Sequence, residues 1–384
     1  MENKFSSWKI YLAVFIGLSI SFLLIYNALQ QQNFIAVKEG THCWQDANNN
    51  GKIDYSNPSE FKSCVHGGYK QQQLVDVLQE IHWSTNSYLW IFAAICCMFG
   101  RDLAYIFRIR TLTHQQLSWK VSVNVILIWE FASALSPGVV GGVSVAMFIL
   151  NKEKIALGRS TAIVLITALL DNLFFILLIP VVFMVVSPEI LFPTNGVVNQ
   201  SISLVFWSGF FIVLSICIVL FISIFKFPTL LCSVLKWMCK VSFLQRFQTK
   251  IAQLENDLSI TSKQMKSEKM LFWAKCFGAT ILSWTCRYLV INCVMAAFIP
   301  LTAYAHFIIL GKQLVLWLFM HVSPTPGGSG VAEFAFGELM GSFSNSAILI
   351  VGLAILWRLI SYFPYLVIGA ILVPAWFKSA VKKS

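Results

Sequence analysis

The stretch from Ala303 to Gly341 reads AYAHFIILGKQLVLWLFMHVSPTPGGSGVAEFAFGELMG, and the interruption at its centre decides the fold. Mostly apolar sequence continues to Val322, stops at a run of Ser, Pro, Thr and Gly, and resumes at Val331. Pro and Gly end helices, and non-helical backbone at membrane depth persists only where protein or a wet cavity satisfies its polar groups. The stretch therefore predicts a re-entrant helical hairpin, which enters a membrane and leaves on the same side.

A second interrupted stretch, Ser118 to Leu150, has the same character. It is too long for one crossing of a hydrocarbon layer roughly 30 Å thick and too short for two crossings with a solvated turn. Ser136-Pro137-Gly138 and Gly141-Gly142 break it in the middle. We predict a second re-entrant hairpin here.

The composition agrees with a membrane protein. Of the 384 residues 57 % are hydrophobic and 12 % charged, whereas an average soluble domain is about one quarter charged. A soluble enzyme, a nucleic-acid-binding protein and a disordered chain are excluded. The predicted fold is an all-α polytopic membrane protein with six full transmembrane helices and two re-entrant hairpins. Its parts are a first transmembrane helix (1–29), an exterior loop (30–86), a first transmembrane half (87–225), a cytoplasmic amphipathic connector (226–270) and a second transmembrane half (271–377).

The net charge of +11 describes the orientation in the membrane. With both termini in the cytoplasm, 21 of the 28 Lys and Arg residues fall on the cytoplasmic side, Arg101 and Arg108 among them. The positive-inside rule favours this orientation, and we predict a bacterial cytoplasmic (inner) membrane protein.

The two halves resemble each other at an offset of 187 residues. Ser136 then corresponds to Ser323, Asp171 to Arg358, and Arg101 to position 288, beside Arg287. The two halves run in opposite directions through the membrane, which predicts an inverted repeat. Inverted repeats whose broken helices meet near the midplane are typical of secondary transporters, with the substrate at the repeat interface.

Three segments carry a family resemblance: Ser323-Pro-Thr-Pro-Gly-Gly-Ser-Gly-Val-Ala-Glu333, Ser136-Pro-Gly-Val-Val-Gly-Gly142 and Trp357-Arg358-Leu-Ile-Ser-Tyr-Phe-Pro364. They resemble the flippase-like transmembrane domain of lysylphosphatidylglycerol synthases, also found in the multiple peptide resistance factor proteins. The resemblance covers about residues 87–377 and implies movement of a phospholipid or another lipid-linked anion between leaflets. Only residues 378–384 follow the last helix, so we expect no aminoacyl-transferase activity.

Charged side chains inside the membrane are functional candidates, because they are costly unless paired or hydrated. We expect Asp171 and Arg358 to pair across the two halves, either as a purely structural pair or as a gate that an anionic headgroup opens. Snorkelling to water is the alternative for Glu333, Glu338 and Lys312. Each Ser-Pro is expected to begin a half-helix whose free N–H groups bind phosphate. The predicted substrate-binding residues are Arg287, Arg358, Asp171, Glu130, Glu333, Lys312, Ser136, Pro137, Gly138, Ser323, Pro324, Pro326, Gly327, Gly328 and Gly330.

The predicted function is that of a lipid flippase or scramblase, with membrane lipids and an anionic phospholipid headgroup as partners. The sequence contains no Gly-x-x-x-x-Gly-Lys-Ser/Thr loop, which argues against direct use of ATP. The alternatives are an integral-membrane enzyme acting on lipid-linked phosphate or sugar, and a non-transporting accessory subunit. The sequence contains no clustered acid, base and nucleophile of the kind that the enzyme alternative requires. We expect no required cofactor. The sequence leaves the oligomeric state open.

The exterior loop carries two further predictions. Cys43 and Cys64 are the cysteines that we place outside, where an oxidising environment favours a disulfide between them. The segment between them follows the first nine positions of an EF-hand calcium loop, but position 12 is Asn57 where a bidentate Glu is needed. Weak calcium binding and an Asn-Gly turn without an ion both remain open; the candidate positions are Asp46, Asn48, Asn50, Lys52 and Asp54.

Overall fold

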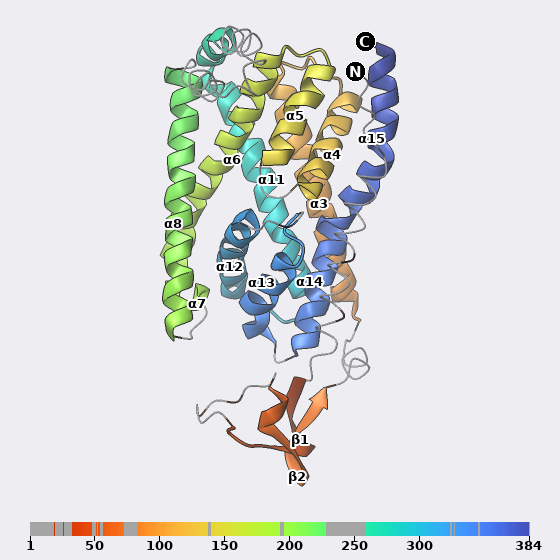
Figure 1. Ribbon diagram of the computed structural model, residues 1–384, viewed down its shortest axis with the longest axis vertical. Helices are drawn as coiled ribbons and strands as arrows, with labels where there is room; N and C mark the ends of the chain where they lie inside the picture. The colour runs from red at the N-terminus through yellow and green to blue at the C-terminus, as the bar shows by residue number, and fades with distance from the viewer. Residues whose placement is uncertain are drawn as a thin grey trace, which may run out of the picture.

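The computed structural model shows a tall bundle of helices above a two-stranded sheet (Figure 1). The structure describes residues 19, 26, 33–47, 51, 53, 57–72, 83–136, 140–192, 196–227, 259–322, 325, 327–344 and 346–383. Several predictions concern residues outside this set: the first transmembrane helix (1–29), most of the connector, Pro137, Gly138, Ser323, Pro324 and Pro326 at the breaks, and Asn48, Asn50, Lys52 and Asp54 of the calcium loop.

The described helices follow one another from Thr85 to Lys383. They are α3 (Thr85–Leu112), α4 (Trp119–Leu135), α5 (Val140–Lys152), α6 (Leu157–Val185), α7 (Pro188–Leu191), α8 (Gly196–Phe221) with a π-helical end η2 (Ile222–Lys226), α11 (Met270–Ala296), α12 (Ala303–Val322), α13 (Val331–Met340) with a 3₁₀ turn η4 (Gly341–Phe343), α14 (Ala347–Ser361) and α15 (Phe363–Lys383).

Six stretches among the described residues are long and apolar enough to cross a membrane: Thr85–Leu112, Leu157–Val185, Ser203–Lys226, Met270–Ala296, Ala303–Met320 and Leu349–Trp376. The protein is therefore a polytopic α-helical membrane protein, as predicted. Five of the stretches coincide with predicted spans. The remaining one lies in α12, which the sequence analysis assigned to a hairpin limb.

Serine residues begin three of these helices by capping the free N–H groups of the first turn. Ser84 and Ser87 form a reciprocal capping box at the start of α3. Ser118 accepts a hydrogen bond from the Val121 N–H at the start of α4, and Ser346 accepts one from the Leu349 N–H at the start of α14. These caps fix where each helix leaves the loop before it.

The short helix pairs lie in different halves of the bundle (Figure 1). α4 and α5 pack against each other in the half that is far from the sheet, whereas α12 and α13 pack against each other in the half near it. α3, α6, α8 and α11 run through nearly the whole height. Ala134 before the first break and Ser329 before α13 are both buried, so the described flanks of the two breaks lie inside the bundle.

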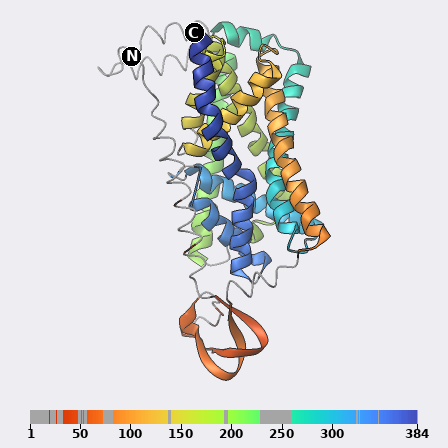
Figure 2. The ribbon, with the colours of Figure 1, turned by 90° about the vertical axis from the view of Figure 1, so that its right-hand side faces the viewer.

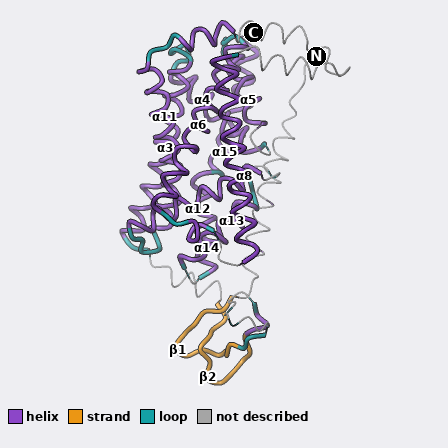
Figure 3. The backbone as a smooth tube through the Cα atoms, turned by 90° about the vertical axis from the view of Figure 1, so that its left-hand side faces the viewer, coloured by secondary structure: helices purple, strands orange, loops and turns teal. Residues whose placement is uncertain are grey.

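α3 and α11 form the most extensive helix contact and lie side by side (Figures 2 and 3). They run antiparallel, since Arg108 near the end of α3 contacts Thr280 near the start of α11. At the crossing, a side chain at Gly100 would meet the Cys286 sulfur at 3.2 Å. The missing side chain of Gly100 thus allows the two backbones to approach closely.

The last span is interrupted, although the sequence predicted it as one continuous helix. α14 ends at Ser361 and α15 begins at Phe363, with Tyr362 between them. Pro364 explains the break, because proline lacks an N–H and its ring clashes with the carbonyl four residues earlier. The interruption turns the side chains of Tyr362 and Tyr365 to different partners, as described below.

The segment predicted as an exterior loop contains a β-hairpin. β1 (Asn33–Trp44) pairs antiparallel with β2 (Phe61–Gln72), and Cys43 and Cys64 form the predicted disulfide. The Phe34 and Phe61 rings stack with centroids 4.2 Å apart. A disulfide and stacked rings together can hold a sheet that is too small to have a core of its own.

Candidate functional site

Arg358 and Glu333 form a buried ion pair at the break before α13. Arg358 is 3 % exposed, and its Nε donates to Glu333 Oε1 at 2.8 Å. The Arg358 Nη2 group donates to the Gly327 carbonyl at 3.0 Å and to the Ser329 hydroxyl at 3.3 Å. Glu333 also accepts from the Gly330 N–H at 2.6 Å, so that its carboxylate caps the first turn of α13. The guanidinium and the free end of a helix thus share one carboxylate.

The backbone at this break requires glycine. Gly327, Gly328 and Gly330 have φ angles of 58°, 68° and 90°, values that other residues rarely adopt. A side chain at Gly327 would meet the Tyr362 ring at 2.3 Å. Three of the glycines that the sequence analysis singled out therefore shape the loop that surrounds Arg358.

Tyr362 connects the two helix breaks. Its ring lies 4.0 Å from the Arg358 guanidinium carbon, and its hydroxyl donates to the carbonyl of Ala134 at 3.1 Å. Ala134 belongs to the last turn of α4, directly before the first break. The end of α4 and the loop before α13 are therefore joined through one side chain, although 191 residues separate Ala134 from Thr325.

The residues around the breaks begin and end helices differently from what we predicted. Ser136 ends α4, and its hydroxyl donates back to the Ala132 carbonyl at 2.7 Å instead of capping α5. α13 begins at Val331 after Gly330, seven residues beyond the Ser-Pro pair. The glycine-rich run cannot easily be helical, since glycine loses the most conformational freedom, so the helix begins only after it.

A second ion-pair network lies between α3, α4 and α15. Arg101 is 1 % exposed and pairs with Glu130 of α4. It also donates to the Tyr365 hydroxyl at 2.8 Å, and that hydroxyl donates to both oxygens of Asp102 at 2.8 Å. Tyr365 lies one turn after Tyr362. The interruption between α14 and α15 therefore contacts the Arg358 loop through Tyr362 and the Arg101 network through Tyr365.

A third pair joins α3 to α6. Arg108 binds Asp171 at 2.5 Å and 3.4 Å, and it also donates to Thr280 at 2.8 Å. The Trp284 N–H donates to Asp171 at 2.9 Å. The Tyr105 ring lies about midway, with its centroid 5.1 Å from Arg101 and 4.8 Å from Arg108.

The predicted pair between Asp171 and Arg358 is therefore wrong. Each of the two residues has a different partner, Arg108 for Asp171 and Glu333 for Arg358. The reason is local: the capping turn of α13 brings Glu333 to Arg358, and α3 brings Arg108 to Asp171. Arg101 and Arg108, which the sequence analysis counted on the cytoplasmic side, are both buried in the bundle.

Lys312 lies at the other end of α13 from Arg358. Its amine donates to the Leu339 carbonyl at 2.6 Å and to the Ser342 hydroxyl at 2.9 Å. The positive charge of Lys312 thus lies at the C-terminal end of α13, where the helix dipole is negative and a cation is favoured. Nine residues of α helix separate Leu339 from Gly330, or about 14 Å at the usual rise. Lys312 is buried and does not snorkel, but it caps α13 and does not join the Arg358 loop.

Arg287 is half-buried on α11 and lies 5.3 Å from the Trp284 ring. Within the described ranges no carboxylate lies within ion-pair distance of it, although Asp102 and Glu130 are close enough to interact electrostatically. Arg101, Arg108 and Arg287 face Asp102, Glu130 and Asp171, so this part of the bundle is formally neutral.

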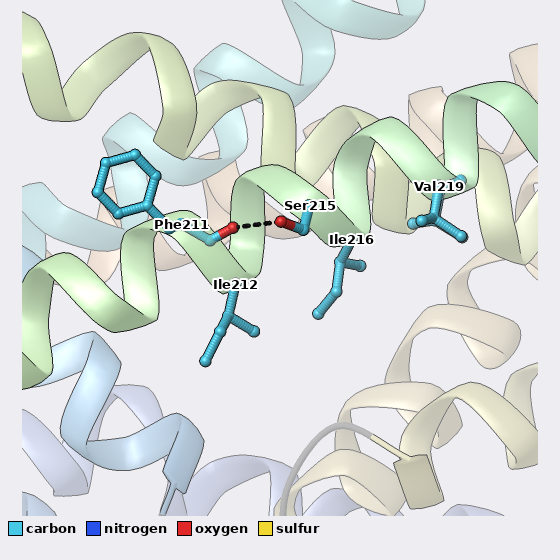
Figure 4. A pocket seen from close by; sticks show the side chains of 6 residues that line it. Phe211, Ile212, Ser215, Ile216 and Val219 are labelled. Carbon is cyan, nitrogen blue, oxygen red and sulfur yellow. Dashed lines mark hydrogen bonds between the residues drawn. The ribbon is translucent and has the colours of Figure 1, made fainter.

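Two pockets among the described residues lie away from these charges. One is an open apolar hollow of about 420 Å³ on the outer face of α8, lined by Phe211, Ile212, Ser215, Ile216, Val219 and Leu220 (Figure 4). In it the Ser215 hydroxyl donates to the Phe211 carbonyl of its own helix at 2.8 Å, so its polar group is satisfied. Another, between α6, α8 and α12, is about 10 Å³, far too small for a headgroup.

Between β1 and β2, the Asp46 carboxylate accepts a hydrogen bond from the Gly51 N–H at 2.8 Å. The contact joins the first and the sixth positions of the predicted calcium loop, and calcium binding stays a prediction. Among the described residues there is no group of three or more His, Cys, Asp or Glu side chains that could hold a metal ion.

Sequence reasoning missed several members of the networks: Asp102, Tyr105, Thr280, Trp284, Tyr362 and Tyr365. A usable signal was the spacing of Arg101 and Arg108, because residues seven apart lie on one face of a helix. Each buried carboxylate also needs a cation, and two such carboxylates, Glu130 and Asp171, were already known from the sequence. The tyrosines carried no comparable signal.

The comparisons with known proteins agree with this architecture. A family model described as the lysylphosphatidylglycerol synthase TM region matches residues 72–369. A UPF0104 membrane protein of Archaeoglobus fulgidus is 26 % identical over 302 residues, which make up 76 % of this chain and 89 % of that protein. No solved structure gives a significant match. Since the family match covers more than half of the chain, from the end of β2 into α15, the protein belongs to the family of the lysylphosphatidylglycerol synthase transmembrane region.

Proposed function

We propose that the protein moves a phospholipid, or another lipid-linked anion, between the two leaflets of a cytoplasmic membrane. The family supports a role connected with membrane lipids. The networks of Arg358, Arg101 and Arg108 lie inside apolar helices, where charged groups are rare and usually functional. The proposal does not include aminoacyl transfer.

We also propose that the bundle is an inverted repeat. Shifted by 187 residues, α3 becomes 272–299 and α4 becomes 306–322, close to the bounds of α11 and α12. The same shift takes α6 to 344–372, which covers α14 and the first part of α15. α3 and α11 cross antiparallel near Gly100 and Cys286, as a two-fold axis in the membrane plane would require. In this arrangement the α4–α5 and α12–α13 pairs are re-entrant hairpins that enter from opposite sides.

The observation that carries the function is the contact of the two breaks through Tyr362, next to Arg358. It gives a headgroup a polar route where two interrupted helices meet, while the acyl chains stay in the surrounding lipid. Arg358 and Arg287 would contact the phosphate, because a guanidinium binds phosphate through several N–H groups at once. Passive scrambling and movement driven by a gradient both fit this route.

Reconstitution in vesicles tests the proposal. Purified protein is placed in liposomes that contain fluorescent phosphatidylglycerol or fluorescent phosphatidylcholine, and a membrane-impermeant reductant then quenches the outer leaflet. We expect the protein to make inner-leaflet phosphatidylglycerol accessible faster than phosphatidylcholine. Arg287→Gln should slow this, and Lys152→Gln, which changes an exposed charge at the end of α5, should not.

Two outcomes would count against the proposal. If fluorescence is quenched to the same extent in vesicles with and without the protein, for both lipids, the protein does not move lipid and the proposal fails. A chemically altered lipid, found by mass spectrometry after incubation, would favour the membrane-enzyme alternative instead.

A further inference from the structure

The Glu333 carboxylate occupies the place that an anionic headgroup would need. Its two oxygens accept from the Gly330 N–H at 2.6 Å and from Arg358 Nε at 2.8 Å. A backbone N–H at a helix start and a guanidinium are the donors that bind phosphate best. The Glu333 side chain is 13 % exposed, so it is less enclosed than Arg358.

Arg358 is held in position independently of Glu333. The Gly327 carbonyl and the Ser329 hydroxyl accept from its Nη2 group, and the Tyr362 ring packs on the guanidinium. If Glu333 turned away, these contacts would keep the guanidinium at the break. The site would then be a fixed cation next to a free helix end.

We propose that Glu333 is an internal substitute for the phosphate of the transported lipid, and that the phosphate must displace it from Arg358. This inference rests on the proposed function and identifies the residue that sets the affinity of the site for anions. Loss of Glu333 alone would leave a buried guanidinium without a counter-charge, which is strongly unfavourable. Exchange of one anion for another avoids that state, so the pair opens only when a phosphate is present.

Glu333→Gln separates the two roles of the side chain. Glutamine at this position of a helix still accepts from the Gly330 N–H, because capping boxes use Glu or Gln. The amide is neutral, however, and leaves Arg358 without its counter-charge. The variant should therefore bind phosphate more tightly than the wild type and depend on it for stability.

The first measurement is the melting temperature of the purified protein in detergent without anionic lipid, titrated with inorganic phosphate. We expect the melting temperature of Glu333→Gln to rise with phosphate concentration, while that of the wild type rises much less. Glu338→Gln is the matched control, since it removes an exposed charge from the same helix. In Arg358→Met/Glu333→Gln the response to phosphate should disappear.

A second arm identifies the source of the phosphate. The same variants are placed in vesicles of phosphatidylcholine with increasing phosphatidylglycerol, and lipid movement is followed at each composition. We expect Glu333→Gln to reach half of its maximal rate at a several-fold lower content of phosphatidylglycerol. A response to inorganic phosphate without such a shift would assign the site to the free ion and overturn its role in lipid movement.

The inference is overturned if Glu333→Gln and the wild type respond equally to phosphate, or if an unstable Glu333→Gln is not rescued by it. These results differ from a failure of the proposed function. If the wild-type protein moves no lipid while Glu333→Gln still binds phosphate, the anion site is supported and the proposed transport function is rejected. If the wild-type protein moves lipid while Glu333→Gln shows no response to phosphate, the transport function is supported and the role of Glu333 as a phosphate substitute is rejected.

Discussion

At the scale of single residues, the structure depends on buried charges that neutralise one another. Arg108 and Asp171 are an example, with the Thr280 hydroxyl and the Trp284 N–H completing their hydrogen bonds. A buried ion pair is weak evidence for net stability, but removal of one partner is costly because it leaves the other charge alone. The pair should therefore behave as a unit under mutation.

We predict that Asp171→Asn destabilises the protein by about 3–5 kcal/mol, since it leaves Arg108 buried without a counter-charge. The double variant Arg108→Met/Asp171→Leu should recover most of this loss, because it contains no buried charge. Denaturant unfolding in mixed micelles measures both. Glu189→Gln, an exposed carboxylate on α7, serves as the control and should stay within about 0.5 kcal/mol of the wild type. Additive losses in the double variant would contradict a paired role.

The sequence identified the acidic halves of these pairs but not how they combine. Glu130, Asp171 and Glu333 stood out because carboxylates are costly within apolar runs. Arg101 and Arg108 did not, since they lie near the end of a span and were counted with the cytoplasmic cations. Pairing depends on which helices touch, and a single sequence contains no record of that.

At the scale of helices, close contact depends on small residues at the crossings. α4 and α15 meet where a side chain at Gly369 would lie 2.1 Å from the Phe131 ring. This contact holds α15, and with it Tyr365, against the helix that carries Glu130.

We predict that Gly369→Ala destabilises the protein by about 1–3 kcal/mol, the usual cost of overpacking. Gly352→Ala is the matched control: it lies in α14 with open space around it and should be neutral or stabilising by up to about 1 kcal/mol. Thermal unfolding of the two variants side by side measures the difference. Equal melting temperatures would show that α4 and α15 do not pack as described.

Helices were the easiest elements to predict, because runs of apolar residues report membrane crossings directly. The break at Tyr362 was missed, since a single Pro364 in an apolar run does not distinguish a kink from a new helix. The β-hairpin was missed as well. Its strands contain Gly40, Gly67 and Gly68 and several irregularities of register, which weaken the alternating pattern that predicts strands.

At the scale of the whole molecule, two interrupted helices from distant parts of the chain meet in the interior. Tyr362, at the interruption between α14 and α15, contacts both breaks, and Tyr365 one turn later contacts Arg101 and Asp102. The sequence located both breaks, but their contact follows from the packing of α4, α14 and α15. A headgroup passing between the breaks would have to exchange contacts with Arg358, which is the central claim of this account.

The most direct test of that claim is the rate of phosphatidylglycerol movement in vesicles with Arg358→Met/Glu333→Gln. This double variant keeps the cap of α13 and leaves no buried charge unpaired, so it should fold. We predict that its rate falls roughly tenfold or more below that of the wild type, consistent with the loss of a charged hydrogen bond of about 1.5–3 kcal/mol. A folded double variant that moves phosphatidylglycerol at the wild-type rate would contradict the account.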